Sequence, residues 1–179
     1  MKQYNLRIEQ EESPESPREW DNLGTMICFH GRYNLGDDHN YNPSDFDGWA
    51  DMEHKLSKEF DGVLLPLYLY DHSGITMNTT GFNCPWDSGQ VGFIGISKAK
   101  IRKEFSVRNV TRDMIARVTN CLIGEVETYD QYLAGELYGY IIEDENGEHV
   151  DSCWGYYGYE HAEEEGKAQL EYRKSQVSL

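Results

Sequence analysis

Apolar residues recur along this chain with two periods, and each period predicts a different kind of element. Every second position is apolar around Tyr4, Leu6 and Ile8, which predicts a strand with one buried face. Pro66 interrupts a nearly continuous apolar run, and because proline has no ladder donor it predicts an edge position or a bulge there. Short apolar runs predict further strands at 25–30, 63–70, 90–97, 137–143 and 149–154.

Apolar residues three or four positions apart predict the helices. The first helix is expected to have Ser44 as its N-cap and to end near Gly62. Ser97 is expected to cap a short helix, and Thr111 is expected to cap the main core helix. The segment at about 160–174 predicts a last, mostly solvated helix.

Two segments between these elements are rich in turn residues. Residues 71–88 form a polar loop, broken only by an alternation at Ile75 and Met77 that is typical of an edge strand. Asn146-Gly147 predicts a two-residue hairpin turn, because both residues tolerate positive φ. The element order lacks a regular βαβ alternation, which predicts an α+β fold: a mainly antiparallel sheet with helices packed on one face, in a single domain over 1–179.

The charge of the chain restricts its partners. There are 32 acids against 16 bases, a formal net charge of -16, and this charge opposes binding to nucleic acid or to an anionic membrane. The negative charge is more compatible with a protein partner that is basic or that binds nucleic acid. The alternative is that the acidity only keeps the protein in solution.

Cysteine usage and the apolar segments indicate a cytoplasmic protein. Cys28, Cys84, Cys121 and Cys153 are spread singly, without CxxC spacing, so free thiols in a reducing compartment are expected. No segment has the apolar length of a spanning helix or of a signal peptide. We expect no export, no membrane partner and no cofactor.

The 71–88 loop holds the residues that would carry catalysis. A cysteine- or metal-assisted hydrolase would use Cys84 as nucleophile, His72 as base and Asp87. However, Asp71 and Asp87 would raise the pKa of the thiol, and neither Asp37-Asp38-His39 nor Asp71-His72-Asp87 has metal-ligand spacing. The sequence therefore favours no catalytic residue and no metal, with Trp86 anchoring the loop and Asp87 with Ser88 satisfying turn amides.

Acids and bases are unevenly distributed along the chain. Residues 98–117 contain seven bases and two acids, whereas residues 125–171 contain fourteen acids and one base. Direct nucleic-acid binding is disfavoured except through the segment 98–117. Glu145 is expected to face Glu148 across the hairpin turn, an arrangement that costs stability and suits either a solvated tip or a surface for a cationic groove. The predicted partner-binding residues are Glu143, Asp144, Glu145, Glu148 and Asp151.

Several motifs resemble a family of small acidic accessory proteins carried by phages, plasmids and their bacterial hosts. The motifs are 67–77 (LYLYDHSGITM), 84–94 (CPWDSGQVGFI), 127–133 (ETYDQYL) and 151–155 (DSCWG), and the similarity spans roughly 20–158. The resemblance implies an accessory or anti-defence role, including the anti-CRISPR class that inhibits type II effector nucleases. It implies no catalytic residues.

The sequence is therefore compatible with three functions. The leading hypothesis is an inhibitor that binds a nucleic-acid-handling defence nuclease through its carboxylates. The second is the hydrolase built on Cys84, His72 and Asp87. The third is a host interaction module without catalytic activity.

Overall fold

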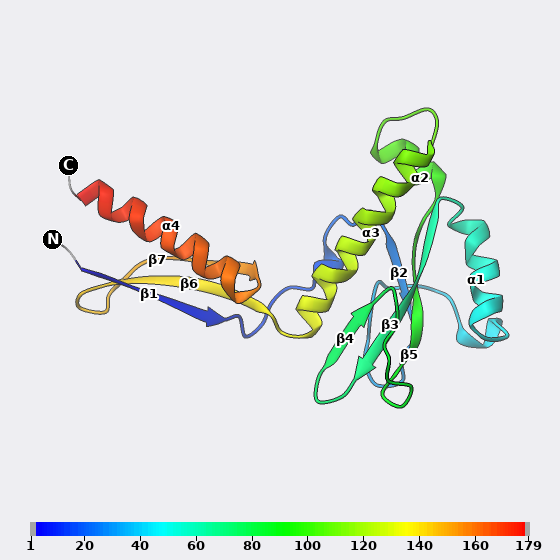
Figure 1. Cartoon of the computed structure of the whole chain (residues 1–179), viewed down its shortest axis with the longest axis horizontal. Coiled ribbons are helices and arrows are strands. Elements are labelled where there is room, and N and C mark those ends of the chain that lie inside the picture. The colour runs from blue at the N-terminus through cyan, green and yellow to red at the C-terminus, as the bar shows by residue number, and fades with distance from the viewer. Residues whose placement is uncertain (1–2, 178–179) are drawn as a thin grey trace. The chain divides into compact units, whose positions relative to one another are not determined.

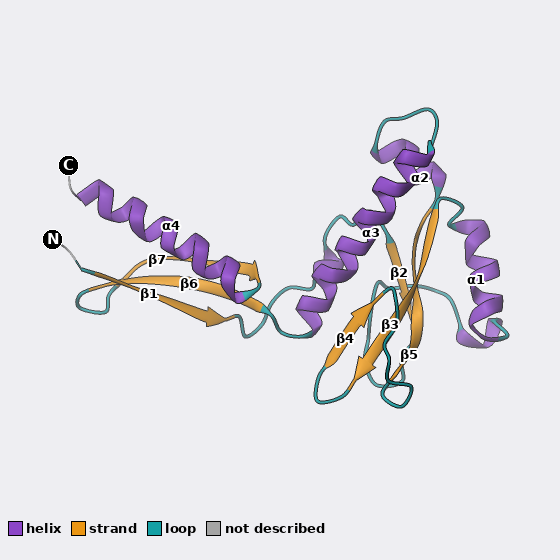
Figure 2. Ribbon diagram, in the orientation of Figure 1, coloured by secondary structure: helices purple, strands orange, loops and turns teal. Residues whose placement is uncertain are grey.

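The computed structural model describes residues 3–177, which form four α-helices and seven strands in two antiparallel sheets (Figures 1 and 2). The predicted α+β class with antiparallel pairing is confirmed, but the strands form two sheets where the sequence predicted one. The strands are β1 (Tyr4–Gln10), β2 (Thr25–Cys28), β3 (Val63–Asp71), β4 (Ile75–Asn78), β5 (Ser88–Ile96), β6 (Leu137–Asp144) and β7 (His149–Tyr157). The helices are η1 (Pro17–Glu19), η2 (Pro43–Asp45), α1 (Gly48–Glu59), α2 (Lys98–Glu104), α3 (Arg112–Leu133) and α4 (Tyr159–Val177).

The chain groups into two compact units. Unit 1 consists of Met1–Glu15 and Gln131–Leu179, and unit 2 consists of Ser16–Asp130. Each unit contains one of the two sheets. Helix α3 is continuous through the boundary between the units. A single domain over 1–179 stays a prediction.

In unit 1, α4 packs on a three-stranded sheet with the order β1-β6-β7. The helix can approach closely because Ala162 and Gly166 occupy the buried positions of its face. A Cβ atom at Gly166 would lie 2.8 Å from Leu6 Cδ1 and 2.9 Å from Tyr140 Cβ. The predicted C-terminal helix is thus present and mostly exposed, and it buries Ala162 and Gly166 against the sheet.

The β6–β7 hairpin has a different turn from the one predicted. Asp144 N donates to Glu148 O (2.9 Å) and Gly147 N donates to Asp144 O (3.0 Å), which closes a three-residue loop. Gly147 has a φ of +80°, whereas Asn146 does not take the left-handed conformation that a two-residue turn requires of both residues. Glu145 and Glu148 therefore do not form a cross-strand pair, and Glu143 lies opposite His149 instead.

Unit 2 is built on a four-stranded sheet with the order β2-β5-β3-β4. Strand β4 is the edge strand predicted from Ile75 and Met77, and it pairs with β3 only from Tyr68 to Asp71. Pro66 of β3 therefore lies beyond the end of β4, and a register shift follows it between Leu67 and Tyr68. This confirms the position predicted for Pro66.

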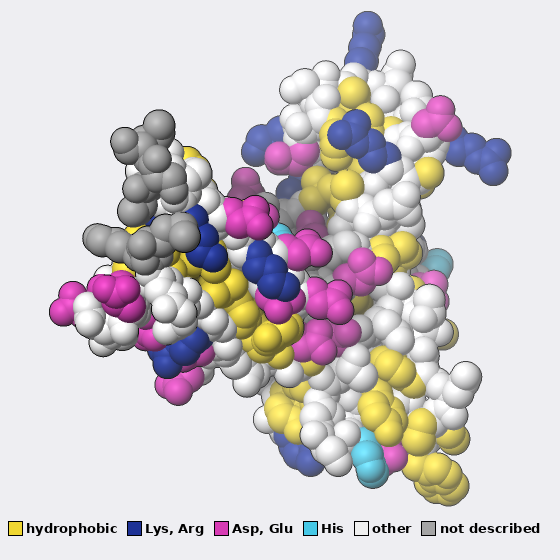
Figure 3. All heavy atoms as spheres, turned by 60° about the vertical axis from the view of Figure 1, so that its left-hand side comes forward, with side chains coloured by type: hydrophobic (Ala, Val, Ile, Leu, Met, Phe, Trp, Pro, Cys, Tyr) yellow, Lys and Arg dark blue, Asp and Glu magenta, His cyan; other side chains and the backbone are white. Residues whose placement is uncertain are grey.

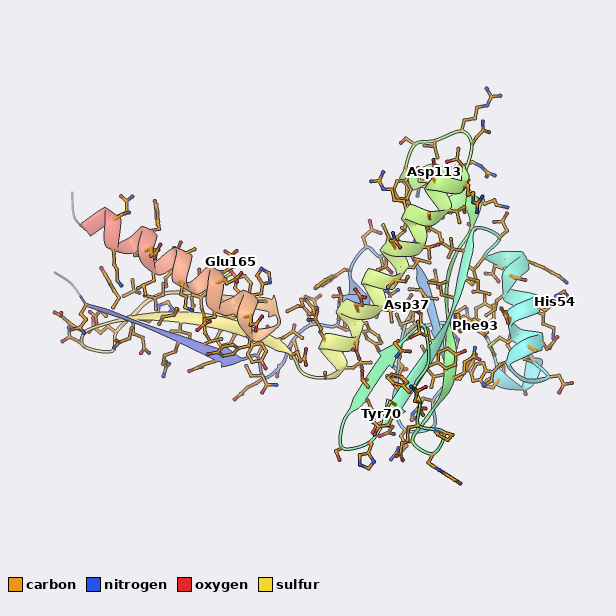
Figure 4. All side chains as sticks on the ribbon, viewed as in Figure 1. Asp37, His54, Tyr70, Phe93, Asp113 and Glu165 are labelled. Atoms are coloured by element: carbon orange, nitrogen blue, oxygen red, sulfur yellow. The ribbon has the colours of Figure 1, made fainter. Side chains whose placement is uncertain are left out.

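Helices lie on both faces of the unit 2 sheet, whereas the sequence predicted one (Figure 1). Helix α1 contributes Met52 and Leu56 to a core with Ile27 and Phe93, and Figure 4 shows Phe93 between the sheet and α1. Helix α3 covers the other face with its buried residues Val118, Leu122 and Val126. Neighbouring residues of a strand point to opposite faces, so β2 and β5 supply apolar side chains to both helices.

The predicted caps of α2 and α3 are confirmed, but the cap of α1 is wrong. Lys100 N donates to Ser97 Oγ (3.2 Å) and Met114 N donates to Thr111 Oγ1 (3.3 Å). Ser44 lies in η2, and α1 begins only at Gly48, after Asp47. Among residues 3–177, no helix has the length and apolar character needed to cross a membrane.

Candidate functional site

One polar face of α3 holds the loops of unit 2. The carboxylate of Glu125 accepts hydrogen bonds from Leu23 N (2.7 Å) and Gly24 N, and the hydroxyl of Tyr129 accepts one from Gly36 N (3.0 Å). Asp130, on the next turn, accepts hydrogen bonds from Thr76 Oγ1 and Met77 N, both at 2.7 Å. These hydrogen bonds give Tyr129 and Asp130 a structural role. Both residues belong to the motif at 127–133.

Arg18 lies at the centre of a second polar cluster in unit 2. Its side chain is only 4% exposed and forms a two-pronged ion pair with Asp37, both contacts at 2.7 Å, and a 3.0 Å contact with Glu125. Burial, with the Asp37 carboxylate beside it, raises the pKa of the Cys28 thiol to about 12, so this thiol is neutral at pH 7. No local sequence pattern indicates this cluster, because Arg18 and Glu125 are far apart in the sequence.

The structure brings together Cys84, His72 and Asp87, the three residues of the hydrolase alternative. Cys84 Sγ lies 3.6 Å and His72 Nδ1 lies 3.4 Å from the same atom, Asp87 Oδ2. A cysteine nucleophile needs its base next to the thiol and the carboxylate beyond the base. Here the carboxylate contacts both other groups, so the arrangement does not have the order of a catalytic triad.

The loop around these residues is held by backbone contacts and not by Trp86. Asp71 N donates to Asp87 O (2.8 Å), and Ser88 Oγ donates to Cys84 O (2.5 Å). The Ser88 hydroxyl thus bonds a carbonyl and not a turn amide as predicted. Trp86 is 92% exposed, so its predicted anchoring role is wrong. Figure 4 shows Tyr70 near the end of β3 that leads into this loop.

A shallow polar pocket of about 440 Å³ lies beside the 71–88 loop. Arg32, Asp71, Trp86 and Asp87 are among the residues that line it, and Arg32 forms an ion pair with Asp71. Within residues 3–177, no three His, Cys, Asp or Glu side chains are grouped so that they would hold a metal ion.

Three of the five predicted partner-binding residues have partners within unit 1. Glu143 forms an ion pair with Arg7 (3.2 Å). The Asp144 carboxylate accepts hydrogen bonds from the backbone of the turn, at Asn146 N (2.8 Å) and Glu148 N (3.0 Å).

Asp151 joins the sheet to α4. Its Oδ2 accepts hydrogen bonds from Gln169 Nε2 (2.6 Å) and Arg173 Nη2 (2.9 Å). These contacts from Gln169 and Arg173 hold the pKa of the Asp151 carboxyl below its usual value. The carboxylate is therefore charged at neutral pH and is already used in packing α4.

Among the other carboxylates of unit 1, six exposed ones form a set that we name the acidic face. Its members make no ion pair with any residue of 3–177 and come from the hairpin loop and from α4, where Figure 4 labels one of them. They are Glu145, Glu148, Glu160, Glu164, Glu165 and Glu171. Glu145 and Glu148 belong to the predicted set; the four on α4 were seen in the sequence only as part of an acidic segment.

The bases of unit 1 do not neutralise the acidic face. Its described residues include fifteen acids and only four bases. Arg7, Lys167 and Arg173 form ion pairs with carboxylates outside the acidic face. The surface of unit 1 is therefore strongly negative.

No family model, no curated protein and no solved structure matches the chain, so the family resemblance of its motifs stays a prediction.

Proposed function

We propose that this protein is an anti-defence protein of a mobile element, which inhibits a nucleic-acid-handling defence nuclease, such as a type II CRISPR effector, by direct binding. The acidic face of unit 1 makes the contact. The observation that carries the proposal is the set of six exposed carboxylates without an ion-pair partner among the described residues.

The physical basis is competition for a basic groove. A nuclease must hold the phosphates of its substrate with Lys and Arg side chains, and an acidic surface that occupies the same groove excludes the substrate. Charge complementarity also accelerates association at low ionic strength. Binding should therefore weaken steeply as salt is added.

The test measures DNA cleavage by a guide-loaded type II CRISPR effector nuclease with and without the protein. We expect the wild-type protein to inhibit cleavage at low salt and the variant Glu145→Lys, Glu148→Lys, Glu164→Lys to lose inhibition. Folding should survive, because these side chains are exposed and make no ion pair in the described chain. Glu143 is left unchanged, since it pairs with Arg7.

A control variant separates the acidic face from net charge. Asp38 and Glu53 are exposed acids of unit 2, and neither belongs to the acidic face. Asp38→Lys with Glu53→Lys should be compared with Glu145→Lys and Glu148→Lys, because the two pairs change the net charge equally. If the two double variants inhibit DNA cleavage equally at low salt, the proposal is contradicted.

A further inference from the structure

A second charged surface lies on unit 2, with the opposite sign. Residues 98–117 form α2, the connecting loop and the first turns of α3, and we name this part the basic tip. It holds seven bases and two acids, Glu104 and Asp113, whereas the rest of the chain has nine bases against thirty acids. Figure 3 shows Lys and Arg side chains projecting from this end of unit 2, and Figure 4 marks the place of Asp113.

Three of the seven bases serve the fold. Lys98 Nζ lies 3.9 Å from Asp61, and Lys100 Nζ donates to Asn22 O (2.9 Å). The guanidinium of Arg117 lies over the ring of Phe105, 5.2 Å from its centroid. The other four bases are exposed and form no ion pair with any described residue: Arg102, Lys103, Arg108 and Arg112.

Favourable interaction with a helix dipole explains only some of the four exposed bases. Arg102 and Lys103 occupy the last turn of α2, where cations suit the helix dipole. Arg112, however, is the first residue of α3, where the dipole is positive and a cation is unfavourable. Arg108 lies in the loop just before this positive helix end. Two of the four bases thus lie at or just before a helix end where positive charge costs stability.

The composition of the basic tip identifies the kind of partner. Protein interfaces contain apolar or aromatic anchors, and single-stranded nucleic acid is bound by exposed aromatic rings. The exposed large apolar side chains of the described chain are Trp20, Trp86, Trp154, Tyr159 and Tyr172, and none of them lies in the tip. Three of the four unpaired bases are arginines, whose guanidinium groups match phosphate geometry.

We propose that the basic tip binds the phosphate backbone of a nucleic-acid duplex. Recognition is by charge alone, so it is independent of base sequence. The acids elsewhere oppose long-range approach, so the binding is local and sensitive to salt. The inference does not rest on the proposed inhibition, because the tip and the acidic face belong to different units and have opposite charge.

The test is fluorescence anisotropy of a short fluorescein-labelled DNA duplex titrated with the complete protein, without any nuclease. Four phosphate contacts predict a slope of log K against log salt of about -3.6, which is roughly a hundredfold weakening between about 50 and 200 mM salt. Arg108→Gln with Arg112→Gln should weaken binding and reduce this slope to about -1.8. Circular dichroism confirms that the variant is folded.

Lys58→Gln with Lys167→Gln is the matched control, because it removes the same charge from exposed positions outside the tip. We expect the control to bind the duplex as the wild type does. Absence of duplex binding at low salt, or an equal loss in both variants, overturns the proposal. Binding of polyglutamate in place of the duplex also overturns it, since the tip would then recognise an acidic protein.

Discussion

Arg18 shows how one buried side chain joins three segments of unit 2. It contacts Asp37, Glu125 and the carbonyl of Gly24, and the same two carboxylates accept hydrogen bonds from the backbone of Met26 and Leu23. Each charge is compensated only while the others stay in place. Removal of the guanidinium therefore leaves two carboxylates with reduced exposure and no cation.

We expect Arg18→Met to lower the free energy of unfolding by about 3–5 kcal/mol, the usual cost of breaking a buried ion pair on one side. Denaturant unfolding followed by circular dichroism measures this loss. Lys167→Met is the control, because Lys167 forms an exposed ion pair with Glu163 one helical turn away. Lys167→Met should lower the free energy of unfolding by only about 0.5 kcal/mol. A similar decrease in both variants would show that the Arg18 cluster adds no stability.

Cys84 lies beside Asp87, and this contact bears on the hydrolase alternative. The same carboxylate contacts His72, so the base does not lie between the thiol and the carboxylate as it does in a catalytic triad. We expect Cys84→Ala to retain the full inhibitory activity of the wild type in the cleavage assay. Complete loss of activity in a variant with an unchanged melting temperature would instead favour the enzyme.

Two helical glycines, Gly124 and Gly166, differ in what they contribute to stability because their helices pack differently. Outside its own helix backbone and chain neighbours, Gly124 in α3 has no heavy atom within 4 Å of the place where a Cβ would stand, whereas Gly166 in α4 lies against Leu6 and Tyr140. Glycine within a helix costs about 0.5–1 kcal/mol relative to alanine, in either place. Only at Gly166 does close approach to the sheet compensate for that cost.

The same substitution should therefore have opposite effects in the two helices. Gly124→Ala is expected to raise the free energy of unfolding by about 0.5–1 kcal/mol. Gly166→Ala is expected to lower it by about 1–3 kcal/mol, because α4 must move away from the sheet. Thermal unfolding measures both, and stabilisation by Gly166→Ala would contradict the packing of α4 seen here.

Helix α3 connects the two compact units, so it bears on how the complete chain unfolds. Its residues up to Asp130 belong to unit 2 and its last turn belongs to unit 1. We expect scanning calorimetry to show one transition with equal calorimetric and van't Hoff enthalpies, as a single domain requires. Gly166→Ala should then shift the entire transition. A shift of one component only would show that the units unfold separately.

The kinds of element and most of their positions followed from local patterns. The periods of apolar residues located the strands and helices, and Ser97 and Thr111 were correctly identified as caps, because periodicity and capping depend on neighbours in the chain. The uneven distribution of acids and bases was also visible in the sequence. Ser44 failed as a cap because Asn42 and Pro43 form a separate short turn before α1.

Contacts between distant segments of the chain decided which charged side chains are paired, how the chain divides into units and that Arg18 is buried. The charges of residues 98–117 and of the hairpin were visible in the sequence, yet only the folded chain shows which of them are already paired. Glu143 and Asp151 are used by Arg7 and Arg173, whereas Arg108 and Arg112 have no such partner among the described residues. The division into two units and the burial of Arg18 likewise depend on contacts between segments far apart in the chain, and a local pattern carries no information about such contacts.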